Sequence, residues 1–192
     1  MTLSEGMKVI AFRGSPRRGG NTETLLKEAL KGAGVEARVF DLNEMQIKPC
    51  QHCGGCEDTG ACIIPDDMEQ VSSAIREADR IILATPVFFS GVSAQVKAMI
   101  DRCQQFWCEK YLLKREIPAG ERGRKGLLLV VGGMKNAQGV ECVGRTAKAW
   151  FRSVSVPEHR TLAYTGVDAL GDILKHPTAL KDALEAGREL VG

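Results

Sequence analysis

The stretch KVIAFRGSPRRGGNTETLL, residues 8–26, decides the fold class, because an apolar run leads through a glycine-rich loop into an amphipathic segment. The run KVIAF is continuous rather than alternating, as is typical of a strand that is buried on both faces. Apolar residues then recur at helical spacing, at Leu25, Leu26, Ala29 and Leu30. Strand, tight loop and helix in this order predict the first unit of a parallel α/β sheet.

The same alternation continues along the chain. Further apolar runs lie at 37–42, 80–85, 126–131 and 160–164, and helical patterns lie at 22–33, 66–78, 92–107, 141–153 and 177–190. Five such alternations predict an α/β fold with helices on both faces of one parallel sheet. No internal repeat or linker divides the chain, so we expect a single domain over 1–192, with a cysteine-rich loop, 48–65, inserted after the second strand. The basic connection 108–125 is expected to be exposed.

Composition narrows the classes of partner. Hydrophobic residues make up 44% of the chain and charged residues 26%, which is typical of a globular protein. Because 26 Lys and Arg nearly balance 24 Asp and Glu, we expect a small-molecule ligand and neither nucleic acid nor a membrane as partner. The start MTLSEGMKVIAF lacks the pattern of a signal peptide, and no stretch approaches the roughly 18 apolar residues of a membrane span. We therefore expect a cytoplasmic protein.

The loop after the first strand has the chemistry of a phosphate site. Ser15, Asn21 and Thr22 offer side-chain hydrogen bonds, and a glycine such as Gly20 lets the backbone come close to an anion. Arg17 or its neighbour supplies charge, and the amino end of the following helix adds its dipole. The alternative is an ordinary βα turn in which Asn21 or Thr22 caps the helix.

Two standard nucleotide fingerprints do not fit this loop. Gly14 and Gly19 have the spacing of a P-loop, but Gly20 and Asn21 stand where that motif needs Lys and Ser or Thr, which argues against a kinase or ATPase. The GxGxxG motif of dinucleotide binding is also absent, so NAD bound across a Rossmann crevice has little support. A monophosphate fits better than either.

The loop after the third strand offers a seat for a flat ring. In TPVFFSG, residues 85–91, Pro86 fixes the backbone, Phe88 and Phe89 present flat apolar surface, and Gly91 permits a close approach. Either phenylalanine could equally be a core residue. A third turn, VGGMKNAQG at 131–139, contains Gly133 and would border the same crevice, unless it is a simple turn.

Four of the seven cysteines lie within a short stretch, in the pattern C-x2-C-x2-C-x5-C at Cys50, Cys53, Cys56 and Cys62. An odd number of cysteines in a reducing compartment argues against a disulfide framework. Thiolates this close in sequence suit the separate irons of a cluster, so the pattern predicts one [4Fe-4S] cluster. Zinc, which needs four thiolates converging on one atom, and a set of free or regulatory thiols are the alternatives.

The other candidate ligands in the sequence have no ligand spacing. His52, inside the cysteine stretch, could be a ligand, although an exposed loop histidine is more common. We expect Cys103 and Cys142 to be small core residues and Cys108 to be partly exposed.

Taken together, four motifs resemble the iron-sulfur flavoprotein branch of the NADPH-dependent FMN reductase family. They are GSPRRGGNT (14–22), the cysteine stretch running into DDM, TPVFFSGVSAQVKAMIDR (85–102) and GDILKHPTALKDAL (171–184). The resemblance implies a flavodoxin-like fold with strand order 2-1-3-4-5, FMN held by the 14–22 and 85–91 loops, and a homodimer or homotetramer that closes the flavin site. Carried over by position, the FMN phosphate would be held by Ser15, Arg17, Asn21 and Thr22, and the ring would be lined by Pro86, Val87, Phe88 and Phe89.

One departure from the family pattern concerns the ring site. The family often has Tyr followed by another aromatic residue where this chain has Phe88 and Phe89, so a hydroxyl contact there is not carried over.

These observations predict an FMN-dependent oxidoreductase carrying a [4Fe-4S] cluster. Electrons would pass from a ferredoxin or NAD(P)H, the latter as a substrate, to a small-molecule acceptor. No side chain is an evident acid or base, so no catalytic residue is assigned. The alternatives are an NAD(P)H-dependent FMN or quinone reductase without a cluster, and a flavodoxin-like electron carrier without turnover of its own.

Overall fold

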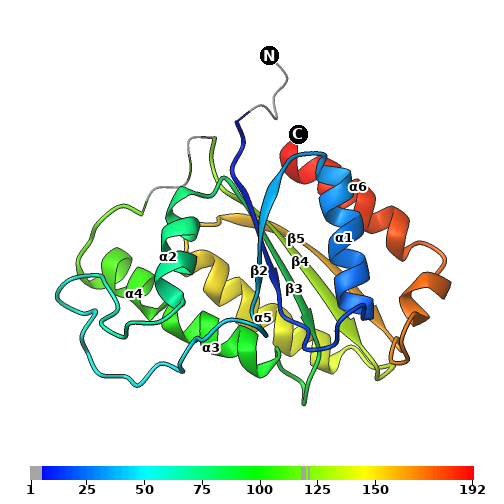
Figure 1. The fold of residues 1–192 in the computed structure, drawn as a ribbon, viewed down its shortest axis with the longest axis horizontal. Coiled ribbons are helices and arrows are strands. Elements are labelled where there is room, and N and C mark those ends of the chain that lie inside the picture. Colours follow the sequence, from blue (N-terminus) through cyan, green and yellow to red (C-terminus); the bar gives the residue numbers. More distant parts are fainter. Residues whose placement is uncertain (1–5, 118–119, 121) are drawn as a thin grey trace.

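A five-stranded parallel sheet forms the centre of the computed structural model, which describes residues 6–117, 120 and 122–192 (Figure 1). The strands lie in the order β2-β1-β3-β4-β5, and every neighbouring pair is parallel. This confirms the predicted flavodoxin-like fold and its strand order. The strands are β1 (Val9–Arg13), β2 (Ala37–Asp41), β3 (Arg80–Pro86), β4 (Lys125–Gly132) and β5 (Glu158–Thr165).

The helices follow the strands much as the periodicity predicts, with one difference. The expected helix over 92–107 is divided into two pieces at Cys103, and the second piece continues as a short π-helix, η1. Its register changes because Leu113 N–H donates to the Cys108 carbonyl, five residues back (3.0 Å). The helices are α1 (Asn21–Ala33), α2 (Met68–Glu77), α3 (Ala94–Arg102), α4 (Gln104–Trp107), η1 (Cys108–Leu112), α5 (Gln138–Ser153), the 3-10 turn η2 (Asp172–Lys175) and α6 (Ala179–Val191).

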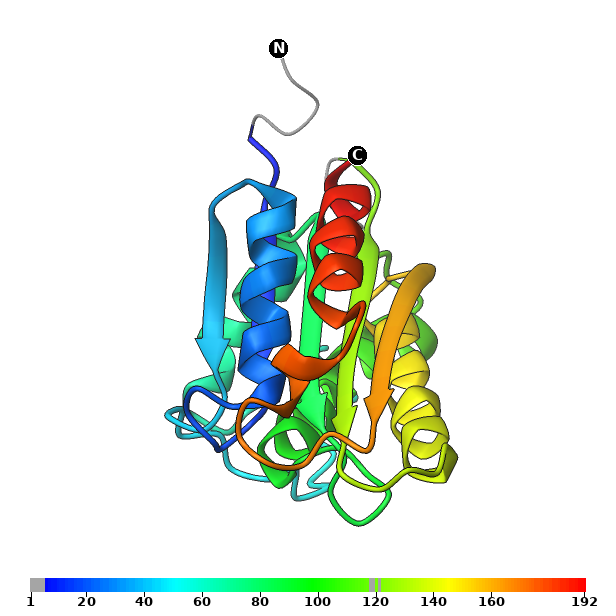
Figure 2. The same ribbon diagram turned by 90° about the vertical axis from the view of Figure 1, so that its right-hand side faces the viewer.

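Each face of the sheet is covered by its own set of helices, as Figures 1 and 2 show from two directions. Helices α1 and α6 pack on one face, and α2, α3 and α5 pack on the other. Side chains of one strand alternate between the two cores, so that Ile81 and Leu83 belong to one and Ile82 and Ala84 to the other. The continuous apolar runs of the sequence are explained by this burial on both sides.

Helices α1 and α6 approach each other closely because each contributes a glycine to the contact. A Cβ atom on Gly32 would lie 1.9 Å from the Leu184 carbonyl oxygen, and one on Gly187 would lie 1.9 Å from that of Ala29. Neither position tolerates a side chain without a shift of backbone. The contact fixes α1, whose amino end carries the first candidate loop.

The connection from 108 to 125 is only partly as expected. Its middle positions 118, 119 and 121 lie outside the described residues. On either side of them, Cys108, Ile117 and Arg124 are buried, which corrects the expectation that the whole connection is exposed. The Arg124 guanidinium donates to three backbone carbonyls, those of Ala78 (2.8 Å), Val154 (2.6 Å) and Arg76 (3.1 Å), so its charge is satisfied by peptide dipoles.

All five strands end at the same edge of the sheet, at the bottom of Figure 1. The glycine-rich loop after β1, the cysteine-rich loop after β2 and the turns after β3, β4 and β5 gather there. This is the edge at which open parallel sheets bind their ligands. Among the described residues, no helix is both long enough and apolar enough to pass through a bilayer.

Candidate functional site

The first loop is held against the third strand by two hydrogen bonds at Gly14. Its N–H donates to the Ala84 carbonyl (2.8 Å), and its own carbonyl accepts from the Ser93 hydroxyl (2.6 Å). A Cβ atom on Gly14 would lie 2.2 Å from the Val96 side chain, so only glycine fits here. Because Ser93 is also the N-cap of α3, the loop after β1 and the loop after β3 form one unit.

The amino end of α1 is available to an anion. Its N-cap is Gly20, and no side chain among the described residues caps it. The alternative in which Asn21 or Thr22 caps the helix is therefore wrong. Ser15 and Thr22 are buried beside this end. Uncapped N–H groups at the positive end of a helix dipole are the usual setting for a phosphate.

A nearby carboxylate, Glu23, is neutralised by its own contacts. Its oxygens accept from the Gly19 N–H (2.8 Å) and from Arg13 (2.9 Å) and pair with Lys27 (2.7 Å). The pKa of Glu23 is lowered, chiefly by the hydrogen bond from Lys27, which outweighs the opposing effect of burial. The negative charge is thus offset before a phosphate would meet it.

Two residues predicted to hold the phosphate also bind a neighbouring segment. The Asn21 side chain donates to the Ala169 carbonyl (2.9 Å) and accepts from the Ile173 N–H (3.3 Å). Arg17 donates to the Asp168 carbonyl (2.9 Å). These bonds tie the first loop to the segment after β5. The phosphate contacts of Ser15, Arg17, Gly20, Asn21 and Thr22 stay predictions. For Asn21 the backbone N–H and the second N–H of the side-chain amide are left for this contact.

The turn after β3 displays its aromatic residues. Phe88 and Gly91 exchange two backbone hydrogen bonds of 2.9 Å, and the two residues between them have positive φ, 46° at Phe89 and 60° at Ser90. A left-handed conformation is unfavourable for a bulky residue. The Phe89 side chain is nevertheless completely exposed and Phe88 is 47% exposed, so neither is a core residue. A strained turn that holds an aromatic ring in solvent is typical of a binding site rather than of packing.

A cavity of about 740 Å³ lies beside this turn, at the ends of β3, β4 and β5. Four residues predicted to bind the cofactor line it: Val87, Phe88, Phe89 and Gly133. Gly133 permits the close approach of Asp168, whose carboxylate oxygen would be 2.8 Å from a Cβ atom there. Pro86 and Gly91 shape the turn without lining the cavity.

Other lining residues were not singled out from the sequence. Met134 is 71% exposed at the rim, and Asp168 closes the side toward the first loop. Met134 falls within the predicted third turn, and this was the available signal for it. Asp168 lies in a segment whose sequence has no distinctive motif.

The four clustered cysteines line one small cavity, together with Arg102, Gln104 and Gln105 from the α3–α4 segment. Cys50 and Cys53 are exposed and Cys56 and Cys62 are half-buried. Among the described residues, no three His, Cys, Asp or Glu side chains lie close enough to hold a metal ion. The cavity measures about 30 Å³, so the loop would have to open around a cluster rather than receive it into a finished space.

A fifth cysteine contacts this loop from the protein interior. Cys108, the first residue of η1, is buried, which corrects its expected partial exposure, and its sulfur lies 3.6 Å from that of Cys56. Burial, followed by the interaction with Cys108, raises the pKa of Cys56 to about 12. No spacing pattern predicts this contact, because it depends on the π-helical turn at 108–112.

The remaining cysteines and His52 differ in their exposure to solvent. Cys103 is a core residue, as predicted, and accepts a hydrogen bond from the Trp150 indole (3.2 Å), while burial raises its pKa to about 12. Cys142 is exposed, so the prediction of a core position is wrong: it lies on the outer side of α5, whose buried side is formed by other residues. His52 is exposed in the loop and has a positive φ of 50°.

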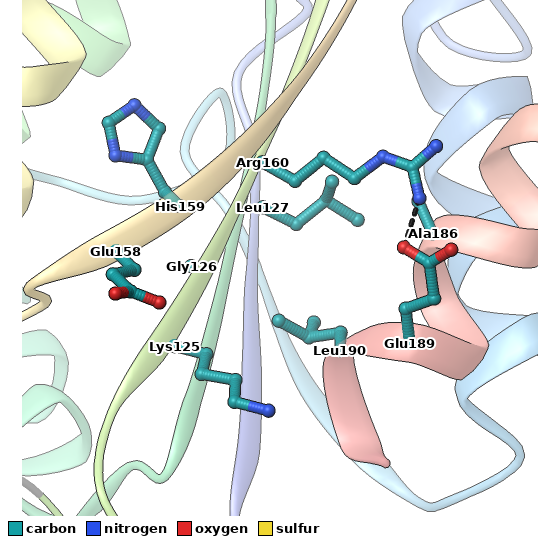
Figure 3. A pocket seen from close by; sticks show the side chains of 9 residues that line it. All are labelled: Lys125, Gly126, Leu127, Glu158, His159, Arg160, Ala186, Glu189 and Leu190. Atoms are coloured by element: carbon teal, nitrogen blue, oxygen red, sulfur yellow. Dashed lines mark hydrogen bonds and ion pairs between the residues drawn. The ribbon is translucent and has the colours of Figure 1, made fainter.

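A second hollow lies at the opposite edge of the sheet, where β4 and β5 begin (Figure 3). It is bordered by an exposed ion pair between Arg160 and Glu189, and its lining includes no residue predicted to bind a cofactor. Because parallel sheets bind ligands at the carboxyl ends of their strands, we assign the functional site to the other edge.

Sequence comparison relates the chain to known proteins. Residues 7–165 match the family described as NADPH-dependent FMN reductase. The chain is 44% identical over 99 residues to an iron-sulfur flavoprotein of Methanocaldococcus jannaschii, covering 50% of this chain and 51% of that protein. It is 35% identical over 133 residues to an iron-sulfur flavoprotein of Methanosarcina thermophila, covering 68% and 65%. The matches thus span half to two-thirds of these relatives.

Solved structures share the fold at low sequence identity. A NAD(P)H:quinone oxidoreductase from Methanothermobacter marburgensis superposes with a TM-score of 0.70 at 21% identity, over 96% of both chains. An FMN-dependent NADH-azoreductase from Bacillus anthracis, solved in complex with FMN, superposes with a TM-score of 0.65 at 12% identity, over 97% of this chain and 100% of that one.

Proposed function

The chain belongs to the NADPH-dependent FMN reductase family, and on that premise we propose that it is an FMN-dependent oxidoreductase that also carries a [4Fe-4S] cluster. The observation that carries the proposal is the unit formed by the two loops through Gly14 and Ser93. It sets an uncapped helix end and an exposed aromatic turn at one edge of the sheet, beside an open cavity. These are the two ends of a binding site for a ring that bears a phosphate.

The residues present fit FMN. The amino end of α1, with Ser15 and Thr22 beside it, would hold the phosphate, and Arg17 would add charge from its bridge to the segment after β5. Phe88 and Phe89 would contact the ring over the 740 Å³ cavity. The chain's own contribution is to bind and orient the cofactor and to limit the access of water to it.

The cysteine loop fits a cluster by its donor set. Cys50, Cys53, Cys56 and Cys62 share one cavity, which supports their prediction as the four ligands. Three of these cysteines lie within seven residues, which suits the separate irons of a cluster better than a zinc ion, on which four thiolates must converge. We therefore prefer the cluster. When bound, FMN would exchange electrons in pairs or singly and the cluster would exchange them singly, which suits exchange between a pair donor and one-electron partners.

We extend the proposal to partners and setting. The donor would be NAD(P)H or a ferredoxin, and the acceptor a small molecule. The exposed apolar residues near the cavity, including Phe89 and Met134, support a homodimer or homotetramer in which a second copy covers the ring site. We propose that residues 1–192 form one domain and that the protein works in the cytoplasm, where a reducing environment keeps its cysteines as thiols.

Cofactor content is the test of this proposal. Protein purified without oxygen would be analysed for iron, acid-labile sulfide, zinc and flavin per chain. We expect one FMN with four irons and four sulfides. FMN with zinc or without metal would replace the proposal by its first alternative, an NAD(P)H-dependent FMN or quinone reductase without a cluster. The absence of flavin would refute it.

A turnover assay distinguishes the proposed enzyme from the remaining alternative, an electron carrier without turnover of its own. The loaded protein would be mixed with NADPH, NADH or a reduced ferredoxin, and the oxidation of the donor followed in the presence of a quinone. We expect sustained turnover with at least one donor. A single reduction without turnover would instead identify a flavodoxin-like electron carrier.

A further inference from the structure

Arg102, the last residue of α3, is a buried cation that lines the cysteine cavity. Its side chain is 1% exposed and pairs with Asp66, through Nη1 to Oδ2 (2.6 Å) and Nη2 to Oδ1 (3.1 Å). The same nitrogens donate to the carbonyls of Lys48 (2.9 Å) and Ile64 (3.1 Å). Arg102 thus binds the cysteine loop at both of its ends.

Asp66 has further partners that spread its negative charge. Its oxygens accept the backbone N–H groups of Lys48 (2.9 Å) and Met68 (3.0 Å), in addition to the two nitrogens of Arg102. The carboxylate therefore accepts four hydrogen bonds among the described residues. It neutralises the charge of the guanidinium but leaves one edge of it without a hydrogen-bond acceptor.

That edge is Nε, which is buried and has no hydrogen-bond partner among the described residues. A buried N–H without an acceptor is costly, most of all on a charged group. Arg102 and Cys62 border the same cavity. Burial lowers the pKa of Arg102, but Asp66 and then Cys62 outweigh this effect and raise it. A sulfur atom that carries negative charge at Cys62 would supply the missing acceptor.

We propose that Arg102 is a positioning residue for the cysteine site, whose Nε–H donates a hydrogen bond to the Cys62 sulfur when that sulfur is a thiolate or a cluster ligand. The inference deepens the proposed function and rests on it for the cluster. Hydrogen bonds to ligand sulfurs and nearby positive charge favour the more negative, reduced state of a cluster and so raise its reduction potential.

The alternative is that Arg102 only closes the loop by binding Asp66 and two carbonyls. Both views predict that the loss of Arg102 destabilises the loop. They differ for Asp66→Asn. If Arg102 acts on the sulfur, removal of its counter-ion strengthens the positive field at Cys62, whereas Arg102→Gln abolishes it. If the pair is only a clasp, both variants loosen the loop in the same way.

Charge-selective alkylation of the cluster-free protein measures this field directly. Reduced protein would be treated with iodoacetate, which is anionic, or with iodoacetamide, which is neutral, and labelling at Cys62 followed by peptide mass spectrometry. The ratio of the two rates cancels differences in thiolate fraction and exposure. We expect Arg102→Gln to lower the ratio several-fold and Asp66→Asn to raise it. Arg102→Lys, which keeps the charge, should give an intermediate ratio.

Arg124→Gln is the matched control, because it also removes a buried arginine. Among the described residues, Arg124 hydrogen-bonds to backbone carbonyls only, and it does not line the cysteine cavity. Its ratio at Cys62 should equal that of the wild type. Equal ratios in all variants, or a fall in both Arg102→Gln and Asp66→Asn, would overturn the proposal. If Arg102→Gln does not fold, Arg102→Lys and Asp66→Asn still give opposite signs.

The loaded protein provides a second readout. The midpoint potential of the cluster should be more negative in Arg102→Lys than in the wild type or in Arg124→Gln, and an unchanged potential would contradict the proposal. If the wild type binds no cluster, the proposed function fails while the alkylation ratios still decide the role of Arg102. The two failures can therefore be told apart.

Discussion

Phe89 has an unfavourable left-handed backbone conformation and a fully exposed ring. A substitution at this position should therefore change stability and FMN affinity in opposite directions. Glycine has no Cβ penalty at positive φ, so Phe89→Gly should raise the free energy of unfolding of the cofactor-free protein by about 1 kcal/mol. Loss of the ring should weaken FMN binding about 3–10-fold, as expected for one aromatic contact. Chemical denaturation and flavin fluorescence titration measure the two effects.

The control for Phe89 is Ser155→Gly, which relieves a similar positive φ of 59° just before β5, away from the cavity. It should stabilise the protein without changing the affinity for FMN. Unchanged affinity in Phe89→Gly would show that the exposed ring has no part in flavin binding.

Asp66 gives the cysteine loop a dependence on acid. Burial raises its pKa, but Arg102 and the N–H groups of Lys48 and Met68 outweigh this, so the pKa lies below its ordinary value. A carboxyl with a lowered folded-state pKa stabilises the protein at pH values above its unfolded pKa of about 3.9 and loses this contribution as pH falls through the folded pKa.

Asp66→Asn should therefore cost about 3 kcal/mol at pH 7, the typical effect of removing one partner of a buried ion pair. The difference in unfolding free energy from the wild type should shrink below about pH 4, where Asp66 becomes protonated first in the unfolded chain, and vanish as pH falls through its lower folded-state pKa. Denaturation at a series of pH values measures it. A difference that is independent of pH would show that Asp66 contributes no charge-dependent stability.

At the residue scale, sequence reasoning recognised types of chemistry better than contacts. The uncommon pairs and spacings, Phe88 with Phe89 and Cys50 to Cys62, predicted surfaces that the structure does bring to one edge. The roles of Asn21 and Arg102 could not be predicted in this way, because their partners lie far away along the chain. Cys142 was misplaced because a small apolar side chain fits a helix surface as well as a core.

At the scale of elements, the contact of α1 with α6 limits what can replace its glycines. Gly187→Ala would place a methyl group against the backbone of α1 and should lower the free energy of unfolding by about 1–3 kcal/mol, as other overpacked sites do. Thermal melts followed by circular dichroism test this. FMN affinity should not change, because the contact lies along the helices and not at the loops.

Gly144 in α5 supplies a control of opposite sign. Apart from the neighbouring residues and the nearby backbone of α5 itself, no atom of the described residues lies within 4 Å of a Cβ atom placed there. Gly144→Ala should therefore stabilise the helix by about 0.5–1 kcal/mol through backbone entropy alone. A stabilising effect of Gly187→Ala would mean that the two helices are not in such close contact.

Element boundaries follow from local sequence only where local forces decide them. Ser93 begins α3 as an N-cap, and continuous apolar runs mark the strands. The break at Cys103 and the π-helical turn at 108–112 were not predicted. Both depend on tertiary packing, since Trp150 contacts the Cys103 sulfur and the cysteine loop lies on Cys108.

At the scale of the whole molecule, all five strands point the same way, so FMN is expected to bind at the edge where they end and not at the edge where they begin. FMN at about 100 times its dissociation constant should stabilise the protein by about 2.7 kcal/mol, which corresponds to a rise in melting temperature of about 5–10 °C. Arg160→Ala, which breaks an exposed ion pair beside the far hollow, should melt with the same FMN-induced shift. A smaller FMN-induced shift in this variant would mean that flavin binds at the far hollow and not at the carboxyl ends of the strands.

The parallel α/β fold class was predictable from the alternation of strands and helices, for which right-handed crossovers leave few topologies. The strand order itself was predicted from the family resemblance. Which loops meet was then a matter of geometry, since all carboxyl ends lie together. The contacts of individual loops were not predictable: Arg17 and Asn21 donate to the carbonyls of Asp168 and Ala169, which come before the 171–184 motif and belong to no motif.

The same polarity determines how the molecule could be attached to a surface. Helix α6 runs back along the sheet, and the carbonyl of Leu190 near its end accepts a hydrogen bond from Arg80 at the start of β3, so Gly192 lies at the edge remote from the loops (Figure 2). A linker added after Gly192 would immobilise the protein on an electrode with its cysteine loop and aromatic turn facing the solution. Electrons would then have to pass between the electrode and the protein through a soluble mediator, because the sheet stands between the electrode and the two proposed cofactor sites.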